Sequence, residues 1–412
     1  MPPKSEMEVV VLNDYASFTG GASSVALQSA IALAGRGIKV TLFSAVGPVA
    51  SVLRDCKNLD VVCTGQHGIA EDPNRLRSFY QGIWNQSAIT ELTSLLASKD
   101  PGRTIIHVHS WMKALSPGVI STALNRGFRV AVTLHDFFAV CPSGGFYIHR
   151  ERKMCERRPL SASCLTCNCD RRTYSHKLWR FARTTLQNCW LKIADRIHHY
   201  IGVSQFSVDV MKPYLPRRTP VTIVRNPVDC RDSGPAPVDK GSAFVFVGRF
   251  VAEKGAGLFA DAADRANVPA VFVGGGELEA DLRRRSPRGA FTGWLEAGQV
   301  TATLRKARAL VFPSLWYETL GLSAIEAMAN GVPVIASDRC AASEFVEDGF
   351  SGLHFQRGSV ESLASQLRRL RDDDFALRLG RNAYDWYWRN PWSLDAHVNQ
   401  LSEVYRSMLQ NP

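Results

Sequence analysis

The chain has 412 residues, more than one ordinary domain, and its 45% hydrophobic and 21% charged residues are typical of a soluble globular protein. No apolar run approaches the roughly 18–20 residues that a membrane-spanning helix needs, and the N-terminus leads into a strand without a signal-peptide pattern. We therefore expect a cytoplasmic protein whose ten cysteines are mostly reduced.

The net charge of +11 comes from one part of the chain. Residues 150–225 hold 16 lysines and arginines against five acids, so the rest of the chain is balanced. Such a local excess indicates an anionic partner, which could be membrane lipid, nucleic acid or a phosphorylated acceptor, or it is a solvated face without a partner. Because no nucleic-acid-binding motif is visible, we expect no nucleic-acid partner.

The first half of the chain alternates short apolar strands with helical stretches, which is typical of a parallel α/β sheet. Strands are predicted at residues 9–12, 39–44, 60–63, 104–108, 129–134, 200–203 and 221–224. Helices are predicted at residues 25–34, 78–97 and 171–199. The last of these carries an apolar stripe at spacings of three or four, with basic and aromatic side chains off the stripe that resemble an interfacial membrane contact or pack on the preceding loop.

Two kinds of residue mark the loops that follow these strands. Gly20 and Gly21 occupy the first strand-to-helix turn, where glycine lets backbone approach a ligand, although a plain flexible loop is the alternative. His109 and His135 each follow a predicted strand, at the sheet edge where open α/β sheets bind ligands. Asp136 and the phenylalanines after it favour a shaped pocket at His135, whereas a structural role is the alternative for each histidine.

Residues 141–176 have weak periodicity and carry five cysteines. The spacing of Cys164 and Cys167 is that of a metal knuckle, and Cys141 and Cys155 would complete a structural zinc site with four thiolates. The outer spacings are irregular, so free buried thiols or a disulfide formed on air oxidation are equally consistent with the pattern.

The α/β pattern restarts after residues 230–240, a stretch rich in proline, aspartate and glycine that predicts a linker. Strands are predicted at residues 243–247, 270–273, 290–292, 309–312, 334–336 and 352–355. Helices are predicted at residues 258–266 and 320–329 and at the C-terminal end, where Ser393 is a candidate N-cap.

The stretch from residue 312 to 337 combines a loop, a helix and a turn between two of these strands. Glu318 lies in the loop before the helix and Glu326 lies inside the helix. The free N–H groups at the helix N-terminus would point out of the carboxyl edge of the sheet and would suit a phosphate. Arg249 and Lys254, in the loop after the strand at 243–247, would face the same edge. Two cations and a helix N-terminus together predict a diphosphate clamp.

The residues Gly248-Arg249, Glu253-Lys254-Gly255 and Glu318-x7-Glu326, the last within ETLGLSAIEAMANGVPVIAS, resemble the retaining glycosyltransferases of family four. The resemblance implies the GT-B fold, in which two doubly wound Rossmann-like α/β domains face each other across a cleft. Its N-terminal, acceptor-side domain would span residues 1–228 and its donor-binding domain residues 229–395, with a helix at about 396–412 packing back on the first domain.

The resemblance also implies roles for individual residues, with a nucleotide-diphosphate sugar as the donor and no cofactor for catalysis. Arg249 and Lys254 would neutralise the donor diphosphate, Glu318 would contact the sugar, and Glu326 would hold the ribose hydroxyls. His135 would touch the sugar near the reacting carbon. The remaining donor-binding positions lie in the same loops: Gly20, Gly21, Gly248, Gly276, Thr319, Leu320, Gly321 and Leu322.

The function implied is transfer of the sugar, with retention, to a hydroxyl of a glycan, lipid-linked or small-molecule acceptor in polysaccharide or glycolipid biosynthesis. Residues 141–176 depart from the minimal family pattern and leave the acceptor open. The basic segment further predicts peripheral contact with an anionic membrane. Two alternatives are open: a sugar-nucleotide-binding protein without transferase activity, which would keep the same clamp, and a nucleic-acid-binding protein, which would act through the basic segment.

Overall fold

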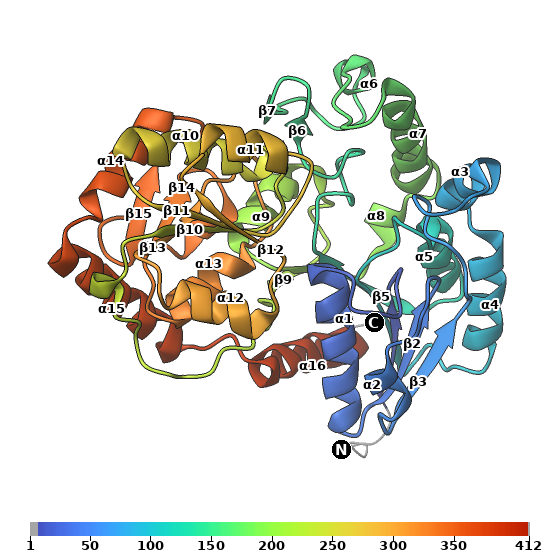
Figure 1. The fold of residues 1–412 in the computed structure, drawn as a ribbon. Coiled ribbons are helices and arrows are strands. Elements are labelled where there is room, and N and C mark those ends of the chain that lie inside the picture. The colour runs from blue at the N-terminus through green and yellow to red at the C-terminus, as the bar shows by residue number, and fades with distance from the viewer. Residues whose placement is uncertain (1–6, 411–412) are drawn as a thin grey trace.

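The computed structural model describes residues 7–410, which fold around two parallel sheets with helices on both faces (Figure 1). The seven-stranded sheet of the N-terminal half has the order β3 (Leu59–Cys63), β2 (Lys39–Ser44), β1 (Glu8–Leu12), β4 (Thr104–Val108), β5 (Arg129–Leu134), β8 (His199–Gly202) and β9 (Val221–Ile223). Each predicted strand of this half is present to within a residue or so at either end. The order reverses direction after β1, so the loops after β1 and β4 meet at the switch point of the sheet.

The six-stranded sheet of the C-terminal half repeats this plan. Its order is β12 (Ala290–Gly293), β11 (Ala270–Val273), β10 (Phe244–Val247), β13 (Ala309–Phe312), β14 (Val334–Ser337) and β15 (Gly352–Phe355). Its helices are α10 (Ala256–Ala266), α11 (Glu279–Arg285), α12 (Ala297–Leu304), α13 (Leu322–Ala329), α14 (Val360–Arg369) and α15 (Asp373–Arg389). The central strands β10, β13 and β14 are almost wholly buried because helices cover both faces, whereas the edge strand β12 is partly exposed. The predicted fold class, two doubly wound α/β sheets, is therefore confirmed.

The helices of the N-terminal half differ from the prediction at one break. They are α1 (Gly21–Gly35), α2 (Ser51–Arg54), α3 (Arg75–Ile83), α4 (Gln86–Ala97), α5 (Ser116–Asn125) and α9 (Gln205–Met211). The single helix predicted at 78–97 is wrong, because the chain leaves the helical conformation at Trp84 and Asn85. The Asn85 side chain accepts a hydrogen bond from the Ala88 N–H at 3.1 Å, so it caps a new helix.

The helix predicted at 171–199 is wrong in two respects. It divides into α7 (Tyr174–Thr185), a π-helical turn at Leu186–Trp190 and α8 (Ile193–Arg196), and β8 begins at His199. Lys192 has φ +48°, which ends the helical path. The orientation of α7 is also opposite to the expectation: it buries Lys177 and Arg183, whereas Leu178 on the predicted apolar stripe is 40% exposed.

The cysteine-bearing segment between β5 and α7 contains a two-stranded hairpin, β6 (Tyr147–Ile148) with β7 (Lys153–Met154), and the short helix α6 (Ala162–Thr166). This segment reaches the C-terminal half. His149 lies 3.8 Å from the Glu253 carboxylate, and Arg171 forms an ion pair of 2.5 Å with Glu277. It therefore forms part of the contact between the two halves.

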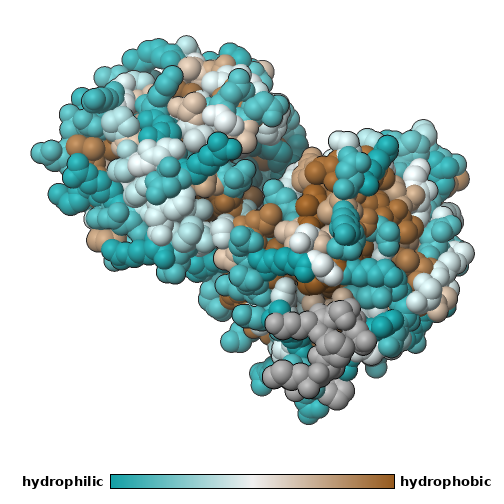
Figure 2. Space-filling model, turned by 90° about the horizontal axis from the view of Figure 1, so that it is seen from below, coloured by the Kyte–Doolittle hydropathy of each residue, from teal (hydrophilic) through white to brown (hydrophobic). Residues whose placement is uncertain are grey.

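The last helix, α16 (Leu394–Gln410), returns from the C-terminal half and lies against α1 (Figure 1). Ser393 caps its start, as predicted, by accepting a hydrogen bond from the Ala396 N–H at 3.1 Å. Leu401 and Tyr405 are fully buried in the same apolar cluster as Val9 and Leu27. Figure 2 shows the molecule from below as two lobes with a hollow between them.

We expect the Leu401→Ala variant to lose about 2–5 kcal/mol of stability, because the substitution leaves a cavity between α16 and α1. Urea unfolding followed by circular dichroism measures this change. The matched control is Glu403→Ala on the exposed face of the same helix, for which we expect less than about 0.5 kcal/mol. Equal unfolding midpoints for the two variants would show that α16 is not anchored through Leu401.

Candidate active site

The loop between β13 and α13 carries Glu318 in a constrained position. Glu318 is 7% exposed and has φ +50°, a left-handed conformation that a residue with a side chain seldom adopts. Its Oε1 atom accepts hydrogen bonds from Lys254 Nζ at 2.5 Å and from Ser314 Oγ at 2.8 Å. Burial by itself raises the pKa of the Glu318 carboxyl, but the charge and hydrogen bond of Lys254 lower it on balance below its ordinary value. Glu318 is therefore ionised at neutral pH.

Lys254 reaches Glu318 because its own loop packs closely on the strand end before Glu318. Gly255 has φ +74°, and a Cβ atom there would overlap the carbonyl oxygen of Pro313. The Leu315 N–H also donates to the Glu253 carbonyl at 2.9 Å. Only a glycine at position 255 allows the loops after β10 and β13 to approach this closely.

Arg249 lies in the same loop as Lys254 and is exposed. Within residues 7–410 its guanidinium has no carboxylate partner. Gly248 before it has φ +152° and its carbonyl lies against Gly274, while Gly276 packs with φ +156° against the Phe250 backbone. The loops after β10 and β11 thus lie in contact through glycines. Beside this contact lie the Arg249 guanidinium, which has no carboxylate partner in the described residues, and the Lys254 ammonium, which is paired with Glu318.

The N-terminus of α13 meets the other half of the chain. Gly321 caps the helix with φ +93°, which leaves the first N–H groups of α13 without a side-chain partner. A Cβ atom added at Gly21 would lie 3.9 Å from Cδ1 of Leu322, so the Gly20–Gly21 turn stands over this helix end. The Gly20–Gly21 turn of the N-terminal half therefore lies next to the N-terminus of α13, and a helix N-terminus favours bound anions.

Glu326 lies one turn further along α13 and differs from Glu318 in having no partner. No hydrogen bond or ion pair to its carboxylate occurs in the part of the chain that the structure describes. Burial raises its pKa to about 7. A partly buried carboxylate without a donor is suited to accept hydrogen bonds from ligand hydroxyls.

Thr319 joins the two halves directly beside Glu318. Its hydroxyl donates to the His135 carbonyl at 2.9 Å, and its own carbonyl accepts from Ser204 Oγ at 2.6 Å. Leu315, Trp316 and Tyr317 pack against the N-terminal core. The β13–α13 loop is therefore held from both sides, with His135 immediately across the junction.

His135, which is partly buried, is the first of three histidines in a row, and His109 and His107 behind it are buried. His135 Nε2 lies 2.9 Å from His109 Nδ1, and His109 Nε2 lies 3.2 Å from His107 Nδ1. The row ends at the hydroxyl of Tyr405 on α16, 2.6 Å from His107 Nδ1. Burial lowers the pKa of His135 to about 3, so the imidazole is neutral at physiological pH. A neutral ring donates from one nitrogen and accepts at the other, so the contact with His109 orients His135 from behind. At His107, Nδ1 is shared by His109 and the Tyr405 hydroxyl, and Nε2 lies 2.7 Å from Thr133 Oγ1.

Sequence reasoning named His135 and His109 but missed His107 and Tyr405. A signal for His107 was present, since residues two apart on a strand share a face. Tyr405 lies 298 residues from His107 and gave no local signal. Ser314 and Ser204 were also missed, because a serine in a loop is common and only its contacts distinguish it.

Of the alternatives for the cysteines of residues 141–176, the zinc site is not supported. Within residues 7–410 no group of three or more histidines, cysteines or acids is arranged to hold a metal ion. Cys141, Cys155, Cys164 and Cys167 are free thiols, and the fully buried Lys177 donates from Nζ to Cys164 Sγ at 3.2 Å. An ammonium group thus lies among the thiols, where a metal ion would supply the positive charge.

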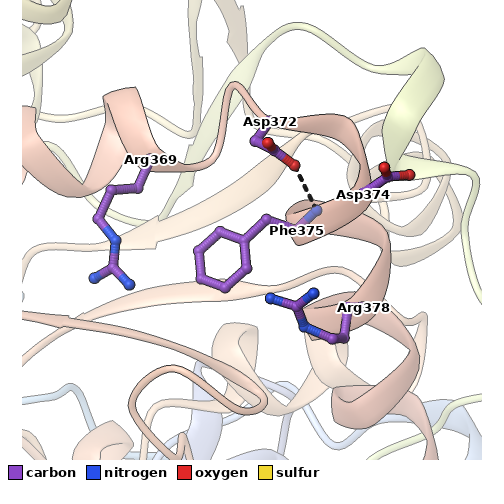
Figure 3. A pocket seen from close by; sticks show the side chains of 5 residues that line it. All are labelled: Arg369, Asp372, Asp374, Phe375 and Arg378. Carbon is purple, nitrogen blue, oxygen red and sulfur yellow. Dashed lines mark hydrogen bonds between the residues drawn. The ribbon is translucent and has the colours of Figure 1, made fainter.

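A surface hollow lies away from these residues, at the junction of α14 and α15 (Figure 3). Asp372 caps α15 through the Phe375 N–H at 2.8 Å, and the guanidinium groups of Arg369 and Arg378 lie 5.3 Å and 5.1 Å from the Phe375 ring centre. Helix capping and cation–π packing account for these residues. We assign the hollow no ligand.

Comparison with known proteins places both halves in one family. Residues 19–232 match Glycosyltransferase Family 4 and residues 233–386 match Glycosyl transferases group 1. The chain is 30% identical over 179 residues to the O-antigen chain mannosyltransferase C of Escherichia coli, covering 41% of this chain and 47% of that protein. It is 26% identical over 238 residues to the UDP-Gal:alpha-D-GlcNAc-diphosphoundecaprenol alpha-1,3-galactosyltransferase of Escherichia coli, covering 51% and 58%. The chain thus spans about half the length of these relatives.

Comparison with solved structures supports the fold. Sucrose-phosphate synthase from Thermosynechococcus elongatus superposes with a TM-score of 0.70 at 18% identity, over 98% of this chain and all of that one. At this identity the superposition speaks for the fold alone. Since the Family 4 match covers more than half of the residues, the chain belongs to glycosyltransferase family 4, with the two-sheet GT-B fold.

Proposed function

We propose that the protein is a retaining glycosyltransferase that moves a sugar from a nucleotide-diphosphate sugar to an acceptor hydroxyl. The observation that carries this proposal is the grouping of Arg249, Lys254 and the α13 N-terminus at one sheet edge, opposite His135. Cleavage of the sugar–phosphate bond leaves negative charge on the departing diphosphate. Cations and N–H groups held in place before the reaction stabilise that charge as it develops.

The glutamates divide between the two ends of the donor in this proposal. Glu318, ionised and held by Lys254, accepts from hydroxyls of the sugar, and Glu326 accepts from the ribose. His135, neutral, touches the sugar beside the reacting carbon. The acceptor attacks from the face that the phosphate leaves, and the leaving phosphate assists removal of the acceptor proton, so the configuration at the sugar is retained.

The acceptor belongs to the N-terminal half in this proposal. The names of the two relatives point to polysaccharide or glycolipid synthesis, since one acts on O-antigen chains and the other on a diphosphate-linked polyprenol. A sugar-nucleotide-binding protein without transferase activity would use the same donor residues. Donor turnover in the presence of an acceptor separates these two functions.

A screen of UDP-, GDP- and ADP-sugars tests the proposal, with nucleoside diphosphate release as the measurement. We expect Lys254→Ala to weaken nucleoside diphosphate binding at least tenfold, because a charge-assisted hydrogen bond is lost and Glu318 is left unpaired. Glu318→Gln should lower turnover at least tenfold with a smaller effect on binding. Arg371→Gln, at an exposed site between α14 and α15, is the control. Absence of nucleoside diphosphate binding to the unmodified protein would overturn the proposal.

The raised pKa of Glu326 gives the donor site a pH dependence. The carboxyl ionises at about pH 7 in the folded protein, so it accepts from the ribose hydroxyls above that pH and loses an acceptor below it. We therefore expect nucleoside diphosphate affinity to rise between pH 6 and pH 8, by calorimetric titration. Glu326→Gln should remove the part of this rise that comes from Glu326. The variant therefore separates ionisation of Glu326 from ionisation of the ligand's own phosphate. An unchanged rise in the variant would exclude Glu326 as its source.

We further propose peripheral attachment to an anionic membrane on the cytoplasmic side. None of the helices in residues 7–410 is long and apolar enough to cross a bilayer, while residues 150–225 carry the positive charge. Co-sedimentation with vesicles should increase with the fraction of anionic lipid and fall as salt is raised. Binding that is insensitive to lipid charge would contradict the attachment.

A further inference from the structure

A cavity of about 840 Å3 lies in the N-terminal half, outside the donor residues described above. Its walls include Tyr15 after β1, Lys113 after β4 and Phe138 after β5, so it opens at the same sheet edge as His135. The Asp14 carboxylate holds this edge together by accepting from the backbone N–H groups of residues 113–115 at 2.8–3.0 Å. The volume is within the roughly 300–1,000 Å3 of small-molecule sites.

The charge of the lining is strongly positive. Its ionised side chains are five cations and a single acid, namely Arg75, Lys113, Arg172, Arg180, Arg183 and Glu71. Among residues 7–410, only Arg180 of these cations has an acidic partner, Asp170 at 3.2 Å. Three of the 16 cations of the basic segment, Arg172, Arg180 and Arg183, thus line the cavity together with Arg75 and Lys113, so an anion there would be attracted from several sides.

Arg183 is the distinctive member of this set. It is 2% exposed, donates from Nη1 to the Met112 carbonyl at 2.9 Å, and has a buried Nε–H group with no acceptor in the described structure. The guanidinium stacks 4.7 Å from the Trp179 ring centre. Asp14 and Asp136 face it, but both oxygens of Asp14 and Oδ1 of Asp136 accept backbone N–H groups, and neither carboxylate forms an ion pair with Arg183 in the described residues. A buried guanidinium with an unused donor is costly unless a ligand supplies the acceptor.

The helices that wall the cavity also expose apolar side chains. On α3, Leu76 is 74% exposed, Tyr80 is 67% exposed and Trp84 at its end is 39% exposed, and their spacing of four places them on one face. Phe79 beside them lines the cavity, and its carbonyl accepts from the Trp179 indole on α7 at 3.1 Å. The positively charged cavity therefore adjoins a row of exposed apolar side chains through Phe79, whose ring centre lies 5.6 Å from that of Tyr80. This combination fits a ligand with one charged and one apolar end.

We propose that this cavity binds the phosphate or diphosphate of the acceptor, and that the acceptor is carried on an apolar chain that leaves along the exposed face of α3. The inference rests on the proposed function, since it treats the N-terminal half as the acceptor side. The donor cations Arg249 and Lys254 belong to the other sheet, so the cavity is a second, separate anion site. It also gives a reason for the inverted orientation of α7, which buries Arg183 towards the cavity.

Calorimetric titration with inorganic pyrophosphate tests the anion site independently of turnover. We expect the unmodified protein to bind two pyrophosphates. Lys254→Ala should keep the cavity site, whereas the double variant Lys113→Gln/Arg172→Gln should keep the donor site and weaken the cavity site at least tenfold. Arg183→Gln should also weaken pyrophosphate binding at the cavity site. If Arg183→Gln does not fold, the double variant still tests this site, because Lys113 and Arg172 are exposed. Arg371→Gln should bind as the unmodified protein does.

The outcomes separate the two proposals. One bound pyrophosphate that Lys254→Ala abolishes would overturn the cavity site and leave the donor site intact. A single bound pyrophosphate that is kept in Lys254→Ala but lost in the double variant would support the cavity site and contradict the donor clamp.

The apolar carrier is tested in the Lys254→Ala protein with farnesyl diphosphate, inorganic pyrophosphate and farnesol. We expect farnesyl diphosphate to bind at least tenfold more tightly than pyrophosphate, because part of its chain leaves water. Leu76→Ser/Tyr80→Ser should remove this advantage without weakening pyrophosphate binding. Equal affinities for the two diphosphates would overturn the apolar carrier and indicate a soluble phosphate ester. Farnesol binding as tightly as farnesyl diphosphate would overturn the role of the cations.

Discussion

The ion pair between Lys254 and Glu318 is the contact on which the arrangement of the proposed donor side depends. A buried carboxylate costs several kcal/mol unless it is paired and hydrogen-bonded, and the left-handed backbone at Glu318 adds about 1–3 kcal/mol of strain. Both costs are offset only while Lys254 and Ser314 hold Oε1. The conformation of Glu318 in turn directs Thr319 towards the His135 carbonyl. One ion pair therefore links the loop after β10 to the junction between the two halves.

This arrangement also determines how an anionic ligand can enter. The charge of Lys254 is shared with Glu318, whereas Arg249 is exposed and has no carboxylate partner within residues 7–410. A diphosphate can thus meet Arg249 without breaking any protein contact, while its interaction with Lys254 must compete with a short ion pair. Because Lys254 is already oriented by Glu318, little reorganisation remains when charge develops on the diphosphate.

Most of the strands and turns that carry the proposed donor residues could be predicted from the sequence, because their signals are local. The strands are short apolar runs, and the turns between them contain glycines whose positive φ angles are present at Gly248, Gly255, Gly276 and Gly321. Periodicity failed where tertiary contacts choose among local options. It showed which residues of α7 share a face, but it assumed that the apolar face is buried. Lys177 and Arg183 are buried instead, one against a thiol and one against a carbonyl and an indole ring.

The difference between local signals and tertiary contacts also explains why the proposed acceptor side was not visible in the sequence. The donor residues lie between Gly248 and Glu326, on successive loops of one sheet, so one stretch of chain contains nearly all of them. The cavity beside His135 is assembled from five separated segments, around residues 15, 69–79, 112–113, 138 and 172–183, and no single segment has a pattern of its own. Substitutions in α3 or α7 can therefore alter the shape and charge of this cavity without disturbing the Lys254–Glu318 pair. A chain built in this way can keep one donor chemistry while its acceptor changes.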